Sequence, residues 1–395
     1  MHACGAAGSG VEIARGATKP AVAEAIDASY FHGVDGLGDV CGTAFAYYEG
    51  KVTEEHAMHA QAAGATGGQD EECCDWLEPS ATQAQRALCR LLAKAEAVGP
   101  TNPIDVVLVT LGPLTNLAGL IQCSTGQRNT KQQERIYDLL EHLSHIVIMG
   151  GSANGLGNVT RTAEFNINAD AEAAHIVFSY PWSQAAMLPA ATVTAVAPTG
   201  SINASLSCGT LVTAVSWDIC KDAAVPWQQL DSLCMNSAHS GIGAPPSTVT
   251  NLNDGMETGY YSRCRAAGLS HTGTFLRSVC YLPFVTHREP LEPLVKEELT
   301  SENKRGSKGA VICDCLAVAV ALAHDVDRGN GALVEEYSTV HVDVELQGTH
   351  TRGQTVVDFG HCYDGVTRCR TVRWVTKVDV NVYVNMLSRL FDTHT

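Results

Sequence analysis

Polar side chains gather near the middle of the chain, directly after an apolar run. The run HIVIMGG (145–151) has the pattern of a buried strand that ends in glycines, and GNVTRTAEFNINAD (157–170) follows it. Asn158, Glu164 and Asn166 lie in this second stretch. An ionised carboxylate accepts strong hydrogen bonds from hydroxyls, and amides both donate and accept. These residue types suit a site for a polyol.

The same stretch also suits a purely structural role. Asn166 or Asn168 could cap a helix that begins near Asp170, because short polar side chains satisfy the first backbone N–H groups of a helix. Phe165 either lines a pocket or packs behind it. Composition and spacing leave the sugar site and the capping network equally open.

Composition narrows the class of protein. The net charge of −16 argues against nucleic acid or an anionic membrane as a partner, since both need basic patches. No apolar run reaches the ~18 residues of a membrane span. The first residues lack the basic-then-apolar pattern of a secretory signal, so we expect a cytoplasmic protein whose fifteen cysteines are thiols. Neither a phosphate-binding loop nor a Cys-x-x-Cys motif occurs, which argues against a nucleotide-phosphate site and a zinc ribbon.

The elements that must position the polar cluster alternate between strands and helices. Residues 104–121 have the pattern of a buried strand, a Gly-Pro turn and a helix, and residues 82–98 have helical spacing. Residues 169–179 predict a helix whose first turn carries Asp170 and Glu172, as the helix dipole favours. This alternation predicts an α/β fold with a mainly parallel central sheet flanked by helices on both faces.

Later segments predict further β structure. Residues 337–346 and 370–387 alternate apolar and polar side chains, and the second runs into a C-terminal helix. We find no linker that would divide the chain, so we predict a single domain over residues 1–395. It carries surface insertions near 41–79, 198–209 and 270–307.

Several motifs together closely resemble the inosine–uridine-preferring nucleoside hydrolases, the N-ribohydrolases. The resemblance runs from about Val11 to Leu390, and the AEFN segment with its preceding GN is its most specific part. The motifs are HGVDGLGD (32–39), TLGPLTNLA (110–118), IMGG with GNVTRTAEFNINADAEAAHIVF (148–178), CDCLAVAVAL (313–322) and HTRGQTVVDF (350–359).

The resemblance assigns the polar cluster to the sugar. Asn158, Glu164 and Asn166 match residues that bind ribose hydroxyls in the family. Met149 and Phe165 match positions that line the pocket. The capping alternative then becomes the weaker interpretation.

The resemblance also implies a calcium ion and an acid. The backbone carbonyl of Leu111 and the carboxylate of Asp314 match Ca²⁺ ligands, and His32 matches a catalytic histidine at the pocket edge. Cys313 stands where many members have a histidine that protonates the leaving base. A mostly protonated thiol can still donate a proton weakly, so Cys313 is a candidate acid whose alternative is a buried structural thiol.

The function that this implies is hydrolysis of the N-glycosidic bond of ribonucleosides, to ribose and free base, in purine and pyrimidine salvage. The family usually assembles as a homodimer or homotetramer. The alternative, from a different class, is a catalytically dead nucleoside- or ribose-binding protein, or a subunit that partners an intact homologue. Arg352 and Asp358 match the family too, and we assign them a structural role.

One departure from the family affects this expectation. The family's Asp-rich motif D-x-D-x-x-x-D-D, which supplies most calcium carboxylates and the general base, has no counterpart in the chain. We therefore expect the first strands of the sheet to be missing, with Met1 an internal methionine of a longer protein; loss of the chemistry is the competing explanation. Ca²⁺ takes six to eight oxygen ligands, and Asp314 with Leu111 cannot supply them. The chain as given is expected to be inactive.

Overall fold

The structure is a computed structural model, and a defined part of the chain can be described. The three predicted insertions fall outside this part except for Leu77, and so does His32. The described residues are 12–29, 77, 80–99, 104–125, 130–182, 210–234, 309–323, 332–362 and 371–392.

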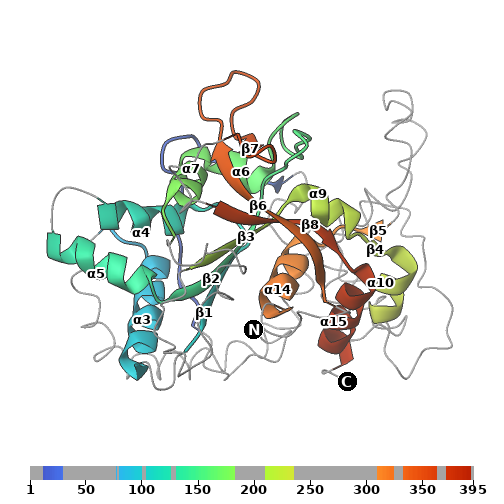
Figure 1. Cartoon of the computed structure of the whole chain (residues 1–395), viewed down its shortest axis with the longest axis horizontal. Coiled ribbons are helices and arrows are strands. Elements are labelled where there is room, and N and C mark those ends of the chain that lie inside the picture. Colours follow the sequence, from blue (N-terminus) through green and yellow to red (C-terminus); the bar gives the residue numbers. More distant parts are fainter. Residues whose placement is uncertain are drawn as a thin grey trace, which may run out of the picture.

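A six-stranded sheet in the order β1-β2-β3-β8-β6-β7 forms the centre of the fold (Figure 1). Strands β1, β2, β3 and β8 are parallel, whereas β6 is antiparallel to β8 and β7 is antiparallel to β6. The sheet is thus mixed and mainly parallel, with its antiparallel pairs built late in the chain. The bounds are β1 Val106–Thr110, β2 Leu143–Met149, β3 Leu211–Val215, β6 Val334–Val344, β7 Thr355–Val357 and β8 Thr371–Val378.

Helices cover both faces of the sheet (Figure 1). Helices α3 (Gln83–Val98), α4 (Thr115–Thr125), α5 (Thr130–Leu140) and α7 (Ala171–Ser179) pack on one face. Helices α9 (Trp217–Asp222), α10 (Trp227–Cys234), α14 (Cys313–Ala323) and α15 (Val380–Asp392) pack on the other. A short helix, α6 (Phe165–Ala169), and a two-stranded sheet, β4 (Val225–Pro226) with β5 (Gly309–Ala310), complete the described elements. In the described part of the chain, no helix has both the length and the apolar character needed to cross a bilayer.

Strand β2 is apolar throughout because both of its faces are buried. Successive side chains of a strand point to opposite faces of the sheet. Ile146 and Ile148 therefore enter the core beneath α4 and α7, while Val147 and Met149 enter the core beneath α14. This double burial explains why the run lacks the polar alternation of a half-exposed strand.

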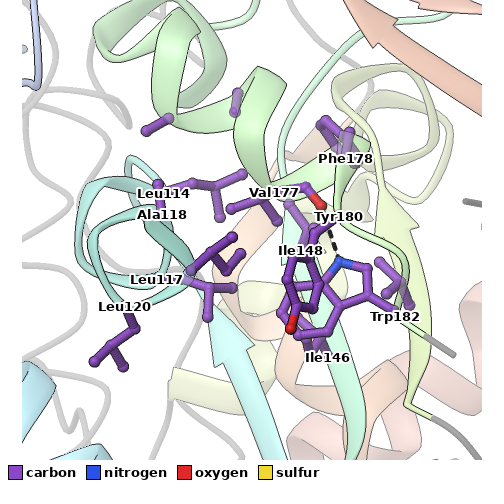
Figure 2. Close-up of a cluster of buried hydrophobic side chains, with 14 of the residues drawn as sticks. Leu114, Leu117, Ala118, Leu120, Ile146, Ile148, Val177, Phe178, Tyr180 and Trp182 are labelled. Carbon is purple, nitrogen blue, oxygen red and sulfur yellow. Dashed lines mark hydrogen bonds between the residues drawn. The ribbon is translucent and has the colours of Figure 1, made fainter. Parts of the chain in front are cut away.

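Figure 2 shows the first of these cores, in which side chains of α4, α7 and β2 meet. Leu117 and Ala118 of α4 face Ile148 of β2 and Val177 of α7. The indole Nε1 of Trp182 donates to the Val177 carbonyl at 2.8 Å, so the polar atom of this buried ring is satisfied (Figure 2).

Most predicted elements are confirmed with shifted ends. Residues 82–98 form α3, with Thr82 as a capping-box residue in front of it, and the C-terminal strand leads into α15 as expected. The helix predicted over residues 169–179 is wrong at its start. Asp170 has a non-helical backbone (φ −147°, ψ 78°) and caps α7, so only Glu172 lies in the first turn. The chain breaks there because the Asp170 side chain replaces a backbone acceptor for the Ala173 N–H.

Asp170 ties three segments together from a fully buried position. Its Oδ1 accepts from the Ala173 N–H at 3.1 Å, and its Oδ2 accepts from the Thr115 hydroxyl at 2.6 Å and the Ala21 N–H at 2.9 Å. Helices α7 and α4 and the segment 12–29 thus share one carboxylate. This junction fixes α4 and α7 beside the carboxyl ends of β1 and β2.

We predict that Asp170→Ala destabilises the fold far more than loss of an ordinary helix cap. Removing the shared acceptor unpairs the buried Ala173 N–H, the half-buried Thr115 hydroxyl and the Ala21 N–H, which costs about 2–4 kcal/mol of unfolding free energy. Thr82→Ala removes a cap and costs about 1 kcal/mol. Urea unfolding followed by tryptophan fluorescence measures both. Equal losses in the two variants would show that Asp170 is a simple cap.

Candidate functional site

The site lies where β2 ends in a turn of two glycines. The Gly150 N–H donates to the Val215 carbonyl at 3.1 Å, and the Gly151 carbonyl accepts from the Trp217 N–H at 2.8 Å, so the turn is bound to the end of β3. Gly151 has φ +85°, a backbone conformation that glycine adopts without strain. The turn therefore points the Gly151 N–H toward the start of α6.

Glu164 receives that N–H as the N-cap of α6. Its carboxylate is 2% exposed. Oε2 accepts from the N–H groups of Gly151 at 3.1 Å and Ile167 at 3.2 Å, while Oε1 accepts from the Asn166 N–H at 3.0 Å. Since a carboxylate oxygen has about two lone-pair sites, Oε2 is filled and Oε1 keeps one acceptor position.

Burial sets the charge state of this carboxylate. Loss of hydration raises the pKa of Glu164 to about 7, although the three backbone N–H groups favour the ionised form and oppose the rise. The negative charge of Asp314 adds to the rise. Glu164 is therefore close to half ionised at neutral pH, and Asp314 of α14 lies within electrostatic reach of it.

Asn166 joins the ends of β1 and β2. Its Nδ2 donates to the carbonyls of Leu111 at 3.3 Å and Met149 at 3.1 Å, and it also contacts the Met149 sulfur at 3.1 Å. These bonds occupy both amide hydrogens. Asn166 is 8% exposed, and within the described residues its Oδ1 has no hydrogen-bond donor. The side chain therefore presents an acceptor.

Asn158 holds the start of α6 from the solvent side. Its Oδ1 accepts from the Phe165 N–H at 2.8 Å, and its own N–H donates to the Ala163 carbonyl at 3.2 Å. The Asn158 side chain is exposed and Phe165 is half-buried. The Asn158 oxygen thus stabilises the start of α6, and its amide group lies at the surface.

The capping network predicted as the alternative exists, but other residues build it. Glu164 caps α6 and Asp170 caps α7, whereas Asn166 reaches back to the strand ends. Asn166 and Asn168 as caps were therefore wrong choices, because helical structure begins at Phe165, four residues before the predicted helix over 169–179. The two interpretations of Glu164 are compatible: it caps a helix and retains one free acceptor position.

The start of α14 brings Cys313 and Asp314 to the opposite face of the sheet. Asp314 lies in the first helical turn, where a negative charge is favoured. The Tyr383 hydroxyl donates to the Ile312 carbonyl at 3.0 Å and fixes the position of this turn against α15.

Thiols surround Cys313. A hydrogen bond to Cys313 together with burial raises the pKa of Cys220 well above its usual value, and burial raises that of Cys315 to about 11. Both neighbouring groups therefore stay protonated at neutral pH. The position of Cys313 is compatible with a proton donor and with a structural thiol.

The described residues do not fit a calcium site. Of the expected ligands, Leu111 offers one backbone carbonyl oxygen, which also accepts from Asn166, and Asp314 offers one carboxylate. Within the described part of the chain, no three His, Cys, Asp or Glu side chains come together in a way that could hold a metal ion. Ca²⁺ needs six to eight oxygens, so these two cannot hold it.

Sequence reasoning missed the residues that hold the turn. The Thr355 hydroxyl accepts from the Ser152 N–H, and the Asp218 carboxylate accepts from the Ser152 hydroxyl and the Ala153 N–H. Cys220 contacts Cys313. Thr355 belongs to the HTRGQTVVDF motif, so the motif carried a signal for it. Cys220 lies outside every motif, and no local pattern marked it.

A doubly covered, mainly parallel sheet whose strand ends carry a buried carboxylate and two amides defines an α/β protein with a polar cluster at the carboxyl ends of its strands. Residues 1–385 match the family described as inosine-uridine preferring nucleoside hydrolase, and the chain belongs to this family.

Sequence relatives are similar over part of the chain. The inosine-uridine preferring nucleoside hydrolase of Crithidia fasciculata is 31% identical over 174 residues, which are 44% of this chain and 40% of that protein. The pyrimidine-specific ribonucleoside hydrolase RihA of Shewanella baltica is 33% identical over 168 residues, 42% of this chain and 37% of the relative. The non-specific ribonucleoside hydrolase RihC of Escherichia fergusonii is 48% identical over 77 residues, 19% of this chain and 21% of the relative. The matched part of the chain thus spans two fifths or less of the length of these relatives.

Solved structures agree in fold. A plant nucleoside hydrolase has a TM-score of 0.50 at 18% identity, with 93% of this chain and 75% of that chain covered. An inosine-guanosine nucleoside hydrolase has a TM-score of 0.52 at 20% identity, with 96% of this chain and 80% of that chain covered. The mainly parallel α/β fold expected from the sequence is thereby confirmed, and the absence of the first strands stays a prediction.

We predict a pH-dependent contribution of Glu164 to stability. Because its folded pKa of about 7 exceeds the ordinary 4.5, the unfolded chain releases this proton first, and the free energy of unfolding falls as pH rises between these values. At ~1.4 kcal/mol per pKa unit the fall is about 3 kcal/mol. Urea unfolding of the wild type and of Glu164→Gln at several pH values isolates it, since the amide does not titrate. A difference between the two proteins that stays constant with pH would contradict the raised pKa.

Proposed function

We propose that the protein binds ribonucleosides through the ribose and functions in the hydrolysis of their N-glycosidic bond, which yields ribose and free base. The observation that carries this proposal is a pair of acceptors on neighbouring residues. Glu164 Oε1 has one acceptor position left, and Asn166 Oδ1 has no donor within the described part of the chain. A vicinal diol supplies two hydroxyl donors, which fits this pair.

The charge of the site supports a sugar over an anion. Glu164 and Asp314 both carry carboxylates, so a phosphate or carboxylate ligand would be repelled. Asn158 offers the complementary donor from its exposed Nδ2. Two acceptors and one donor match a sugar that presents several hydroxyls. Met149 and Phe165 are then the residues that line the pocket beside them.

Binding and charge are linked at Glu164. Hydrogen bonds from hydroxyls favour the ionised carboxylate, so a bound sugar lowers the pKa of Glu164 from about 7. Cleavage of the bond between C1′ and the base nitrogen builds positive charge on the sugar ring. Ionised carboxylates stabilise that charge more than they stabilise the neutral substrate, which is the requirement for catalysis.

The remaining steps need groups beyond the sugar contacts. The bond between C1′ and the base nitrogen breaks and the water oxygen bonds to C1′. The departing base takes up a proton, for which Cys313 is the candidate donor within the described residues, and the proton that the water loses restores the thiol. His32, at the pocket edge by resemblance, is a second candidate. Since the described residues do not fit Ca²⁺, no step is assigned to a metal ion. A homodimer or homotetramer, as the resemblance implies, is the proposed assembly.

The alternative proposal is a nucleoside- or ribose-binding protein, or a partner subunit, that does not hydrolyse its ligand. One observation favours it: the sugar-binding residues converge, whereas the described residues supply two of the expected metal ligands, Leu111 and Asp314. The two proposals share the ribose site and differ in turnover.

We predict that Glu164→Ala weakens inosine and uridine binding by about tenfold to a hundredfold, since a hydrogen bond to a charged group contributes about 1.5–3 kcal/mol. Isothermal titration calorimetry measures the affinities. Asp379→Ala is the matched control, because Asp379 also accepts backbone N–H groups, from Asn381 and Val382, but at the start of α15. Equal affinity of the wild type and Glu164→Ala for these nucleosides would show that Glu164 does not bind the ribose.

Turnover separates the two proposals. With the 395-residue chain and added calcium we expect nucleoside binding without release of free base above background, because the described residues present an incomplete set of ligands. Release of hypoxanthine from inosine, followed by absorbance, is the measurement. Calcium-dependent turnover by this chain would show that the missing ligands lie within it and would reject the binding-protein alternative.

A further inference from the structure

Thr355 of β7 contacts the glycine turn that supports Glu164. Its buried hydroxyl accepts from the Ser152 N–H at 2.9 Å and donates to the Ser152 carbonyl at 2.7 Å. One hydroxyl thus holds both backbone groups of the residue that follows Gly151. The peptide groups on either side of Ser152 cannot rotate without breaking one of these bonds.

The same side chain packs directly on Gly151. A Cβ atom built on Gly151 would lie 2.9 Å from Thr355 Cγ2 and 3.1 Å from Trp374 Cη2, closer than ordinary van der Waals contact. Thr355 and Trp374 therefore form the wall against which the turn is pressed. The N–H of the same glycine, Gly151, donates to Glu164 Oε2 at 3.1 Å.

The segment 348–355 also contacts the rest of the polar stretch at two places and α7 at a third. The Thr162 hydroxyl donates to the His350 carbonyl at 3.2 Å. Arg352 forms an ion pair with Glu172 at 2.7 Å and donates to the Leu346 carbonyl, which agrees with the structural role expected for it. Gly353 (φ +79°) lies so close to Asn168 that a Cβ there would be 2.9 Å from the Asn168 Cα.

We propose that Thr355 is a positioning residue for Glu164. Its hydroxyl fixes the Gly151–Ser152 backbone so that the Gly151 N–H stays on Oε2 and the free acceptor position of Oε1 faces the ligand. The importance of this orientation for ribose rests on the proposed function. The link from Thr355 to Glu164 rests on the contacts alone.

Thr355→Val is the first test, because it keeps the shape of the side chain and removes both hydrogen bonds to Ser152. Thr355→Ser keeps the hydroxyl and loses the methyl group. Thr162→Val is the matched control: it removes a hydroxyl that also bonds the 348–355 segment, but away from the glycine turn. The readouts are the amide proton shift of Gly151 in the ¹⁵N–¹H spectrum of the full chain and the affinity for inosine.

We expect Thr355→Val to move the Gly151 amide proton upfield, as its bond to the carboxylate lengthens, and to weaken inosine binding by about tenfold, the equivalent of one hydrogen bond. Thr355→Ser and Thr162→Val should leave the Gly151 shift and the affinity close to those of the wild type. An unchanged Gly151 shift in Thr355→Val, or an equal change in Thr355→Ser, would overturn the proposal.

The test stays decisive if Thr355→Val does not fold or if the wild type binds no inosine. If Thr355→Val does not fold, Thr355→Cys replaces it, because a cysteine has nearly the shape of a serine but its thiol forms only weak hydrogen bonds. The proposal then requires that Thr355→Cys changes the Gly151 amide proton shift and that Thr355→Ser does not. If the wild type binds no inosine, the proposed function fails, and the Gly151 shift alone still decides whether Thr355 positions Glu164.

Discussion

The structure around the candidate site depends on one buried carboxylate whose partners, within the described residues, are backbone N–H groups. Removing Glu164 from water is costly, and bonds from Gly151, Asn166 and Ile167 offset only part of that cost, as its pKa of about 7 shows. To provide these donors, β2 must end in a glycine turn and α6 must begin directly after Glu164. Thr355 of β7 must hold that turn. The same carboxylate thus explains the conformation of three separate segments.

Partial stabilisation of this kind is useful in a binding site. A carboxylate with all its acceptor positions filled would be stable in the empty protein and have nothing to offer a ligand. Glu164 keeps one acceptor position on Oε1. Asn166 donates its amide hydrogens to the carbonyls of Leu111 and Met149, which leaves its oxygen available as an acceptor. A hydroxyl-bearing ligand completes the set of hydrogen bonds and favours the ionised form. In the proposed ribose site, part of the binding energy comes from the hydrogen bonds that the ligand makes to these two acceptors.

Local patterns in the sequence predicted the strands and helices well, because hydrophobic periodicity records which faces are buried. The double burial of β2 and the extent of α3 follow from such patterns. The roles inside the polar stretch did not follow: Glu164 rather than Asn166 is the cap, since that choice depends on where the Gly151 N–H points. Contacts between distant residues, such as Thr355 with Ser152 and Cys220 with Cys313, are set by how the sheet closes and leave no local signal. The calcium expectation came from resemblance alone, and the described residues do not complete such a site.

Family membership and the geometry of the site support the same sugar, whereas turnover depends on groups beyond the described sugar contacts. The central claim is that Glu164 Oε1 and Asn166 Oδ1 accept hydrogen bonds from two ribose hydroxyls. A crystal structure of the chain with bound inosine tests this most directly. The account predicts ribose oxygens at about 2.5–3.0 Å from both acceptors, with the Gly151 N–H still on Oε2. A nucleoside bound elsewhere, or one whose ribose hydroxyls avoid Glu164 and Asn166, would contradict it.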